Sequence, residues 1–431
     1  MRFEIETVTP LHVGSGSTYP LATEAVVDQN RLRRVSISKL SDLSENDRRK
    51  LERALKKLER ASELKNREAS RAVKEASRAV KEIGEVLKEG EFRYEAELKF
   101  KIDPVRMGRD KIRLNEIREC IKMADVPFIP GSSIKGAIRT ALLWKYAREN
   151  RDELHEYLGG KVEEIRRKME KIRREVNKKE KWKIKEYKKV IKEYKKEIGE
   201  EFVKNVFKLD KKWDAKKDLL KFLSVSDFIP SDSKIEIKDV RTYFSERKIH
   251  SYVETVSGTF IGQISLNPQV RAALKSREYM LLSEKLGILG MDEPNEEEML
   301  EHLKNVLREF NEWCLKKEIE LVKQSELEKV RNALEDVRNK NKEEFLIRAG
   351  FGSGTIYQTL ISLVDAELLK DLLNTLELGI AGKKGEKGEK GEKGKKGEKR
   401  RYEVKDDKLN IPYPKTLEFV DQKPLGWLKL S

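Results

Sequence analysis

Apolar and charged residues alternate along several stretches of the chain, and this pattern predicts β-strands. The first stretch covers residues 3–6 and ends where Pro10 and the glycines of the HVGSGS segment predict a loop. The longest stretch runs from Phe92 to Ile102 and stops at Pro104. Successive side chains of a strand point to opposite faces, so we expect one face in the core and the other in water.

Four more short strands are predicted in the middle of the chain. They cover residues 221–228, 234–240, 250–256 and 258–266. A Ser-Gly pair lies between the last two of these strands. Because serine and glycine are common turn residues, we expect a hairpin at this position.

Helical spacing of apolar residues and long charged stretches predict helices. Ile134, Ile138 and Leu142 recur at the spacing of one helix face, directly after the proline and glycine of the PFIPGSSIKG segment. Residues 38–89 and 151–205 are rich in Lys, Glu, Arg, Leu and Ala. This composition is typical of long helices with solvated faces.

Strands and helices mixed in this order predict an α+β protein with large charged helical insertions. Glycine recurs at every third position between Gly382 and Gly397 without the proline of a collagen helix, which predicts a flexible charged linker. The expected organisation is a core formed first by 1–37 and 91–150, a helical insertion at 38–90, a charged helical insertion at 151–210, core strands at 220–267, a helical block at 268–342, a glycine loop and helix at 343–381, the linker at 382–400 and a C-terminal core segment at 401–431.

The composition limits the partners and the compartment. The 431 residues carry a formal charge of +16, which favours a polyanionic partner such as nucleic acid. Two cysteines far apart in sequence offer neither a disulfide framework nor a zinc site, so we expect no metal, no cofactor and a reducing cytoplasm. No stretch approaches the roughly 20 apolar residues that span a bilayer, so we expect no membrane partner.

The sharpest candidate site is the start of the helix predicted from the GSSIKGAIRT segment. Ser132 or Ser133 can cap this helix, whose free N–H groups and positive dipole end would bind a phosphate. Lys135 and Arg139 lie one helical turn apart and would extend the phosphate site, while Gly136 would let a backbone approach closely. An ordinary capped helix with two solvated cations would show the same residues.

Two glycine clusters are further candidates for RNA contact. His12, Gly14 and Gly16 belong to a strand-to-loop segment whose amides could form an anion nest. In the AGFGSGT segment, Gly352 and Gly354 permit close backbone approach.

The residue before that second cluster, Arg348, would supply a charge, and Phe351 within it would supply a base-stacking surface. Glycine clusters are also common turns, and a phenylalanine is more often part of a core.

Candidate catalytic residues are few. His12 could act as a general base, although a lone histidine is more often a hydrogen-bonding structural residue. Asp28 and Asp227 are isolated carboxylates without a partner at metal-ligand spacing, so no metal nuclease is indicated. We therefore assign no catalytic residue.

Six segments occur in an order that resembles a known family. They are TPLHVGSGS, PFIPGSSIKGAIRTAL, SVSD, YVETVSGTF, IRAGFGSGT and KPLGWLKLS. In this order they resemble the backbone-type RAMP proteins of type III-A CRISPR systems, and among these the fifth subunit of the Csm effector complex. The charged helical blocks and the Gly-Glu-Lys linker lie outside the resemblance.

The resemblance implies a RAMP fold with a ferredoxin-like (RRM-like) core and helical insertions. It implies a non-catalytic subunit that binds crRNA through the phosphate backbone, caps the 3′ end of the complex and supports crRNA maturation and antiviral defence. Expected partners are crRNA and the adjacent backbone subunit, with the small subunit and host nucleases as further candidates. By this resemblance the phosphate contacts would come from Ser132, Ser133, Lys135 and Arg139, with Gly352 and Gly354 shaping the same groove.

Two other functions remain open at this stage. The nuclease-bearing relative carries a catalytic aspartate soon after its first glycine cluster, whereas here Glu24 is the only acid in residues 18–24. Target cleavage is therefore not expected, but a RAMP endoribonuclease that processes CRISPR RNA could use His12 or Tyr19. Alternatively, the charged helices could make the chain a scaffold that recruits a host nuclease.

Overall fold

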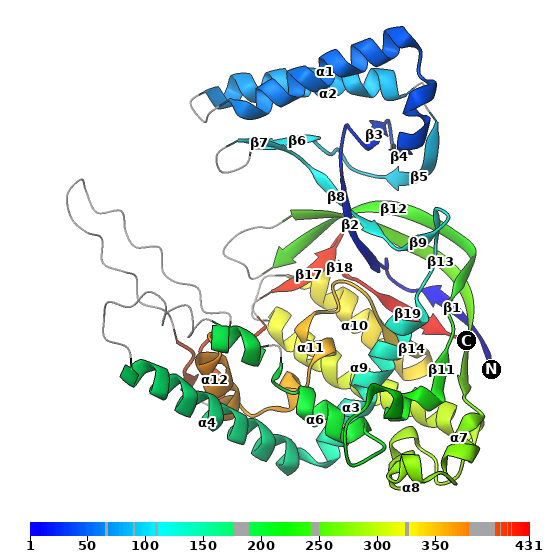
Figure 1. Ribbon diagram of the computed structural model, residues 1–431, viewed down its shortest axis with the longest axis vertical. Coiled ribbons are helices and arrows are strands. Elements are labelled where there is room, and N and C mark those ends of the chain that lie inside the picture. The colour runs from blue at the N-terminus through cyan, green and yellow to red at the C-terminus, as the bar shows by residue number, and fades with distance from the viewer. Residues whose placement is uncertain are drawn as a thin grey trace.

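The computed structural model describes most of the chain. The described residues are 1–64, 68–88, 91–107, 111–175, 189–195, 197–243, 250–323, 327–378, 401–405, 407–411, 413–414 and 416–431. A helical hairpin lies at one end of an elongated molecule, a large β-sheet lies in the middle, and a larger group of helices lies at the other end (Figure 1). The Gly-Glu-Lys linker predicted at 382–400 lies outside the described residues.

Five strands form the middle of the sheet. They are β14 (Phe345–Arg348), β19 (Trp427–Leu430), β1 (Arg2–Thr7), β13 (His250–Leu266) and β12 (Ile229–Tyr243), in that spatial order. Each neighbouring pair is antiparallel. The order β19-β1-β13-β12, with α-helices between β1 and β12 and between β13 and β19, is consistent with the predicted ferredoxin-like core.

The sheet continues beyond β12 and branches at β13. Strand β5 (Phe92–Leu98) runs parallel to β12 and is followed by β4 (Arg31–Val35) and β3 (Ala25–Asp28). Strand β8 (Glu116–Cys120) runs parallel to β13, and β2 (Gly14–Pro20) pairs with β8. The remaining strands are β6 (Val105–Met107), β7 (Ile112–Leu114), β9 (Lys122–Met123), β10 (Val126–Pro127), β11 (Leu223–Val225), β15 (Val404–Lys405), β16 (Lys408–Leu409), β17 (Leu417–Val420) and β18 (Lys423–Pro424).

Helix α3 (Gly131–Glu149) connects the sheet with the main helical layer. Its apolar face buries Ile134 and Ile138, as the helical spacing predicts. Further along the helix Trp144, which is fully buried, packs against Phe310 of α9 with the ring centroids 5.6 Å apart. Helix α3 therefore lies in the centre of the core, between the sheet and α9 (Glu296–Lys323).

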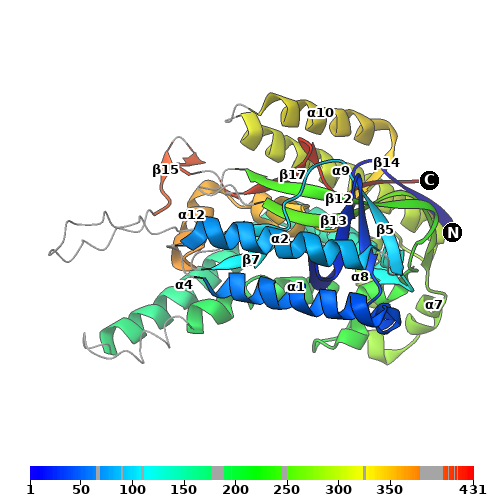
Figure 2. The same ribbon diagram turned by 90° about the horizontal axis from the view of Figure 1, so that it is seen from above.

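The predicted insertion at 38–90 forms a helical hairpin of α1 (Glu45–Glu63) and α2 (Ala69–Leu87). The two helices lie side by side when the molecule is seen from above (Figure 2). Ala54 and Ile83 pack with Val26 of β3 in a separate small core. The hairpin is thus attached to the β3–β5 end of the sheet.

The predicted insertion at 151–210 is joined to the main core. It contains α4 (Arg151–Glu175), which packs against α12 (Ala366–Thr375), and α6 (Glu200–Phe207), whose Phe202 is part of the largest apolar cluster. The other helices are α7 (Gln269–Ala273), α8 (Leu282–Lys285), α10 (Glu328–Glu343) and α11 (Gly354–Gln358), with short 3-10 helices at Ile37–Asp42, Ala215–Lys217, Leu219–Phe222, Arg277–Tyr279, Leu286–Leu289 and Ile361–Leu363.

Two sequence predictions about glycines are wrong. The glycine segment expected as a loop after β1 forms the bulged strand β2. The turn expected before Gly258 is absent, because β13 runs continuously through it. Gly258 has a φ of +135°, and a Cβ there would lie 2.1 Å from the carbonyl oxygen of Asp232. This glycine is needed because the two strands approach each other closely.

Candidate nucleic-acid interface

Helix α3 begins at Gly131, which is packed closely against β11. A Cβ at Gly131 would lie 2.5 Å from the carbonyl oxygens of Val225 and Ser226. The backbone N–H of Gly131 donates to Oδ1 of Asp227 at 2.8 Å. The SVSD segment therefore holds the start of the helix, and it places a carboxylate beside the predicted phosphate site.

The two serines predicted to cap α3 do not do so. The N-cap residue is Pro130, which makes no side-chain cap, and Ser132 and Ser133 lie within the first turn. Ser132 and Gly136 are exposed and one turn apart, and a Cβ at Gly136 would meet no atom within 4 Å. This face of α3 is open, which leaves room for a polymer backbone.

The two cations on α3 differ in what they contact. Arg139 pairs with Asp218 at 2.7 Å, and its guanidinium lies 4.3 Å from the centroid of the Phe207 ring. Lys135 is half-buried and has no carboxylate within 4 Å among the described residues. Burial lowers the pKa of Lys135, and the positive charge of Arg139 lowers it further, against the opposing charge of Asp218. Of the two cations, Lys135 is the one whose charge is not already matched.

Three segments far apart in sequence meet at the first glycine cluster. The N–H of Phe351 donates to the carbonyl oxygen of His12 at 2.8 Å, and the N–H of Gly426 donates to that of Pro10 at 3.0 Å. Gly350 has a φ of +79°, and a Cβ there would lie 2.5 Å from the carbonyl oxygen of His12. The glycines of these loops thus serve close packing between backbones.

His12 is a buried structural residue. Its Nδ1 lies 2.6 Å from the carbonyl oxygen of Glu254, and its ring meets Phe351 edge-on at 5.6 Å. Burial lowers the pKa of His12, although the Glu254 carbonyl and carboxylate act in the opposite direction. Since only 3% of His12 is exposed, it does not face solvent where a substrate could reach it.

The anion nest expected at Gly14 and Gly16 is instead part of a strand. Gly14 pairs with Cys120 and Thr18 pairs with Arg118, so that β2 has extra residues between these pairs and bulges outwards. The bulge is exposed, and Gly16 within it has a φ of +88°.

The expectation that Arg348 offers its charge to RNA is contradicted by its position. Its guanidinium is buried and pairs with Glu318 at 2.7 Å. It also donates to the carbonyl oxygens of Leu425 and Gly352, both at 3.1 Å, and stacks 4.4 Å from the Tyr357 ring centroid. The guanidinium of Arg348 is therefore surrounded by protein groups and is not available to RNA. The spacing of residues in the sequence does not reveal its buried carboxylate partner.

The second glycine cluster extends towards α3. Gly352 packs against Leu425, where a Cβ would come within 2.8 Å of that side chain, whereas a Cβ at Gly354 would meet no atom within 4 Å. Thr355, the next residue, lines the same cavity of about 510 Å³ as Arg139. The structure therefore brings the end of this cluster and Arg139 to one cavity, whereas Lys135, Gly352 and Gly354 are not among the residues that line it.

Comparison with known proteins identifies the family. A family model described as the RAMP superfamily matches residues 4–318. The chain belongs to the RAMP superfamily. A curated relative, the CRISPR system Cms protein Csm5 of Methanocaldococcus jannaschii, is 22% identical over 327 residues, which are 73% of this chain and 65% of the relative. The match thus spans slightly less than two thirds of that protein's length.

Two solved structures share the RAMP fold of this chain. A chain of a Csm–crRNA–target RNA ternary complex from a type III-A CRISPR-Cas system superposes with a TM-score of 0.60 at 20% identity, over 100% of both chains. The crystal structure of T. onnurineus Csm5 superposes with a TM-score of 0.53 at 19% identity, over 99% of both chains. The fold and the family resemblance predicted from the sequence are confirmed.

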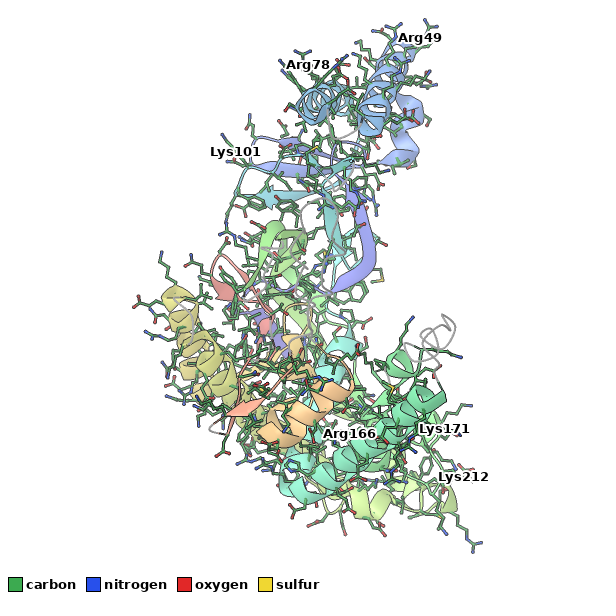
Figure 3. All side chains as sticks on the ribbon, turned by 90° about the vertical axis from the view of Figure 1, so that its left-hand side faces the viewer. Arg49, Arg78, Lys101, Arg166, Lys171 and Lys212 are labelled. Carbon is green, nitrogen blue, oxygen red and sulfur yellow. The ribbon has the colours of Figure 1, made fainter. Side chains whose placement is uncertain are left out.

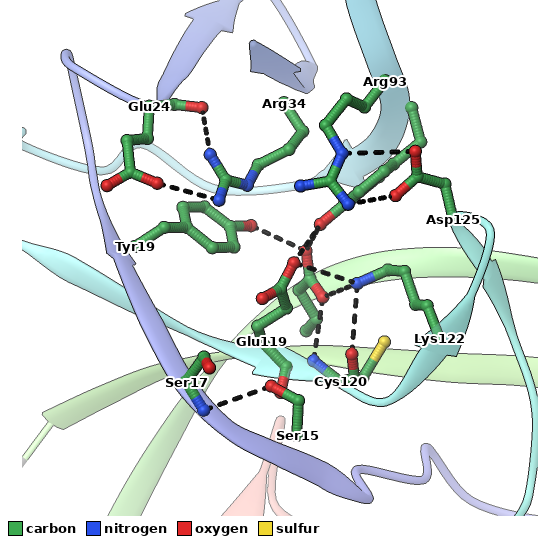
Figure 4. A network of polar contacts seen from close by, with 12 residues as sticks. Ser15, Ser17, Tyr19, Glu24, Arg34, Arg93, Glu119, Cys120, Lys122 and Asp125 are labelled. Carbon is green, nitrogen blue, oxygen red and sulfur yellow. Dashed lines mark hydrogen bonds and ion pairs between the residues drawn. The ribbon is translucent and has the colours of Figure 1, made fainter. Parts of the chain in front are cut away.

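The RAMP chain has a buried glutamate that the sequence analysis missed. Glu254 of β13 is fully buried and accepts hydrogen bonds from the hydroxyls of Tyr19 at 2.7 Å and Tyr94 at 2.8 Å, and from the Cys120 N–H at 2.9 Å. Figure 4 shows Tyr19, Cys120 and Lys122 in this network of polar contacts. It also pairs with Lys122.

Burial raises the pKa of Glu254, but Lys122 and the other donors outweigh burial and hold this pKa below its usual range. The cluster joins β2, β5, β8 and β9 to β13. The sequence held one signal of this cluster, which is the presence of a glutamate within the apolar pattern of a predicted strand.

Glu24, the only acid in residues 18–24, is also paired. Its Oε2 lies 2.9 Å from Arg34, which also donates to the Glu24 carbonyl at 2.8 Å and lies 4.3 Å from the Tyr19 ring centroid.

Over the described residues of this RAMP chain, no group of three or more His, Cys, Asp or Glu side chains could hold a metal ion. Nor is any helix in those residues long and apolar enough to cross a membrane.

The positive charge of the RAMP chain is spread over both ends of the molecule. Arg49 and Arg78 project from the α1–α2 hairpin, and Arg166 and Lys171 project from α4 (Figure 3). Several such cations form exposed pairs, as Arg166 does with Asp371 at 2.9 Å. Net charge alone therefore does not locate an RNA site, and local geometry must do so.

Proposed function

We propose that this chain is a non-catalytic subunit of a type III-A Csm effector complex. It binds crRNA through the phosphate backbone, caps the 3′ end of the complex and supports crRNA maturation in antiviral defence in the cytoplasm. The observation that carries the proposal is the match of the whole fold to a chain of a Csm–crRNA–target RNA complex. The name of the Methanocaldococcus relative and the charge of +16 support it.

The RNA contact is proposed on the open face of α3. Ser132 and Gly136 are exposed there, and Lys135 has no carboxylate partner among the described residues. Arg139 and the end of the second glycine cluster would continue this surface around their common cavity. The adjacent backbone subunit is the proposed protein neighbour, with the small subunit and host nucleases as further partners.

The positions of three residues favour binding over catalysis. An endoribonuclease would use His12 or Tyr19 as acid or base, but both are buried. Burial raises the pKa of Tyr19 well above its usual value, and the carboxylate of Glu254 raises it further. Glu24 is held by Arg34. A group with these surroundings is poorly suited to exchange a proton with RNA near neutral pH.

Photocrosslinking in the assembled complex tests the proposal. The chain is co-expressed with its proposed neighbours and a CRISPR array, and the crosslinked RNA is sequenced. Crosslinks near guide 3′ ends, at peptides that contain Ser132 to Arg139, are expected. Crosslinks at repeat cleavage junctions, with cleavage that is lost in His12→Ala, would establish the endoribonuclease instead. No crosslink to guide RNA would overturn the binding function.

A further inference from the structure

Arg118 of β8 lies where the first and second glycine clusters meet. Its guanidinium lies over the ring of Phe351, with the guanidinium carbon 4.9 Å from the ring centroid. The Phe351 ring is itself held by the edge of His12 and by a small apolar cluster that includes Val253 and Leu425. Phe351 is thus a fixed support beneath an exposed arginine.

Arg118 differs from the other stacked arginines in having no ionic partner. Among the described residues, no carboxylate lies within 4 Å of its guanidinium. Every other described arginine whose guanidinium lies over an aromatic ring pairs with a carboxylate within 4 Å. These arginines are Arg33, Arg34, Arg93, Arg139, Arg148 and Arg348. Arg118 therefore combines a fixed orientation with a charge that is in no close ion pair, although the carboxylate of Glu418 lies near enough to interact with it electrostatically.

The surface beside Arg118 offers backbone without bulky side chains. Thr18 of β2 pairs with Arg118, and Gly14 pairs with Cys120. The residues between Gly14 and Thr18 form the exposed bulge, whose side chains are two serine hydroxymethyl groups and the hydrogen of Gly16. A phosphodiester chain can approach such a bulge closely, and backbone and hydroxyl groups are common phosphate contacts.

We propose that Arg118, supported by Phe351, is a stacking platform for one base of single-stranded RNA, whose backbone follows the bulge of β2. The proposal rests on the RNA-binding function proposed above and adds a site to it. A guanidinium plane stacks on an aromatic ring with one face and can accept a base on the other, while its N–H edges remain free for phosphate. Stacking of this kind tolerates any base, which suits a guide RNA of variable sequence.

The test uses the full-length chain and oligoribonucleotides that carry one 2-aminopurine at successive positions. Stacking on Arg118 is expected to change the fluorescence of the probe at one position when RNA binds. Arg118→Ala should abolish that change and weaken binding at least about fivefold, the lower end of the effect of losing one stacked base. Arg277→Ala is the matched control, because Arg277 is also exposed and its loss lowers the net charge equally.

Two further variants separate stacking from charge. Arg118→Lys keeps the charge without the planar group, so it should restore part of the affinity and leave the fluorescence change absent. Phe351→Leu keeps an apolar side chain against Leu425 and removes the ring, and it should reduce the fluorescence change while thermal unfolding stays close to wild type.

The outcomes distinguish this site from the proposed function as a whole. A full fluorescence change in Arg118→Lys, or equal binding by Arg118→Ala and Arg277→Ala, would overturn the platform while RNA binding stands. Preserved RNA binding in Arg118→Ala together with loss of a protein neighbour from the complex would assign Arg118 to a protein carboxylate instead. Wild-type protein that binds none of the oligonucleotides would overturn both proposals.

Discussion

The carboxylate of Asp227 accepts a hydrogen bond from the backbone N–H of Gly131 at 2.8 Å, and so it closes the first turn of α3. A carboxylate at a helix N-terminus is stabilised by the free N–H groups and by the helix dipole. The same charge repels an incoming phosphate. The N–H end of α3 is therefore partly used by the protein itself, and the open face around Gly136 becomes the stronger candidate for RNA contact.

Replacement of Asp227 should separate its two effects. Asp227→Ala removes the cap and should lower the free energy of unfolding by about 1 kcal/mol, whereas Asp227→Asn keeps a capping side chain and should lower it less. Because Asp227→Asn also removes a negative charge, it should bind RNA as tightly as wild type or more tightly. Urea denaturation and fluorescence anisotropy measure the two effects. Weaker RNA binding by a fully folded Asp227→Asn would show that the carboxylate assists binding.

The Glu254 cluster should make stability depend on pH. Because the pKa of Glu254 is lowered in the folded chain, its contribution to stability is present above about pH 4.5, the ordinary carboxyl range, and is lost as the pH falls through the folded pKa. Glu254→Gln should flatten this acid limb. It should also cost about 3 kcal/mol, because it removes the short ionic contact of the largely buried Lys122 and leaves that lysine only Glu119, at 3.9 Å.

Urea denaturation at several pH values measures this effect. Glu116→Gln is the matched control, since Glu116 is an exposed glutamate of β8, the strand that pairs with β13. An acid limb that remains unchanged in Glu254→Gln would assign the pH dependence to other carboxylates.

The buried pair of Arg348 and Glu318 should act on stability alone. Glu318→Ala leaves an unpaired buried guanidinium and should lower the free energy of unfolding by about 3–5 kcal/mol. The double variant Glu318→Leu with Arg348→Met removes both charges and should recover most of this loss. Its RNA affinity should equal that of wild type. A stable double variant with lost RNA binding would return Arg348 to the RNA site.

The sequence could predict the elements whose signal is local. Alternation located β1 and β5, and helical spacing located α3, because each pattern depends only on neighbouring residues. Strand β2 was missed because GSGSTYP has no apolar alternation, and it forms a strand because β8 pairs with it. The Ser-Gly turn was wrong because glycine also serves close strand contact, which only the position of Asp232 reveals.

The site was harder to predict because it depends on tertiary partners. Arg348 and Arg118 are both basic residues near an aromatic ring, and nothing in their local sequence tells them apart. Glu318 on α9 buries and neutralises Arg348, whereas Arg118 stays exposed above Phe351. Which arginine keeps a usable charge is therefore decided by distant residues.

The salt dependence of RNA binding should report the role of Lys135. If Lys135 contacts a phosphate, Lys135→Ala should reduce the slope of log K against log salt by about 0.7, the value for one contact to a single strand. Lys135 is the cleaner test of α3, because Arg139→Ala would also free Asp218 and expose Phe207. Lys275→Ala, at another exposed lysine, is the control. Equal slopes in the two variants would remove Lys135 from the site.

Two glycines of α3 should respond to alanine in opposite ways. Gly131→Ala forces a methyl group to within 2.5 Å of two carbonyl oxygens and should cost about 1–3 kcal/mol through overpacking. Gly136→Ala places its methyl group in open space inside a helix and should raise stability by about 0.5–1 kcal/mol.

RNA binding turns the Gly136 variant into a test of the interface. If the RNA backbone lies directly on α3, the methyl group of Gly136→Ala should push it away and weaken binding even though the protein is more stable. Stability and affinity then change in opposite directions, which no unfolding effect can produce. Anisotropy titration beside thermal denaturation measures both quantities. Unchanged affinity in Gly136→Ala would mean that RNA does not approach this turn of α3, and the contact would have to be sought on the Arg118 side of the molecule.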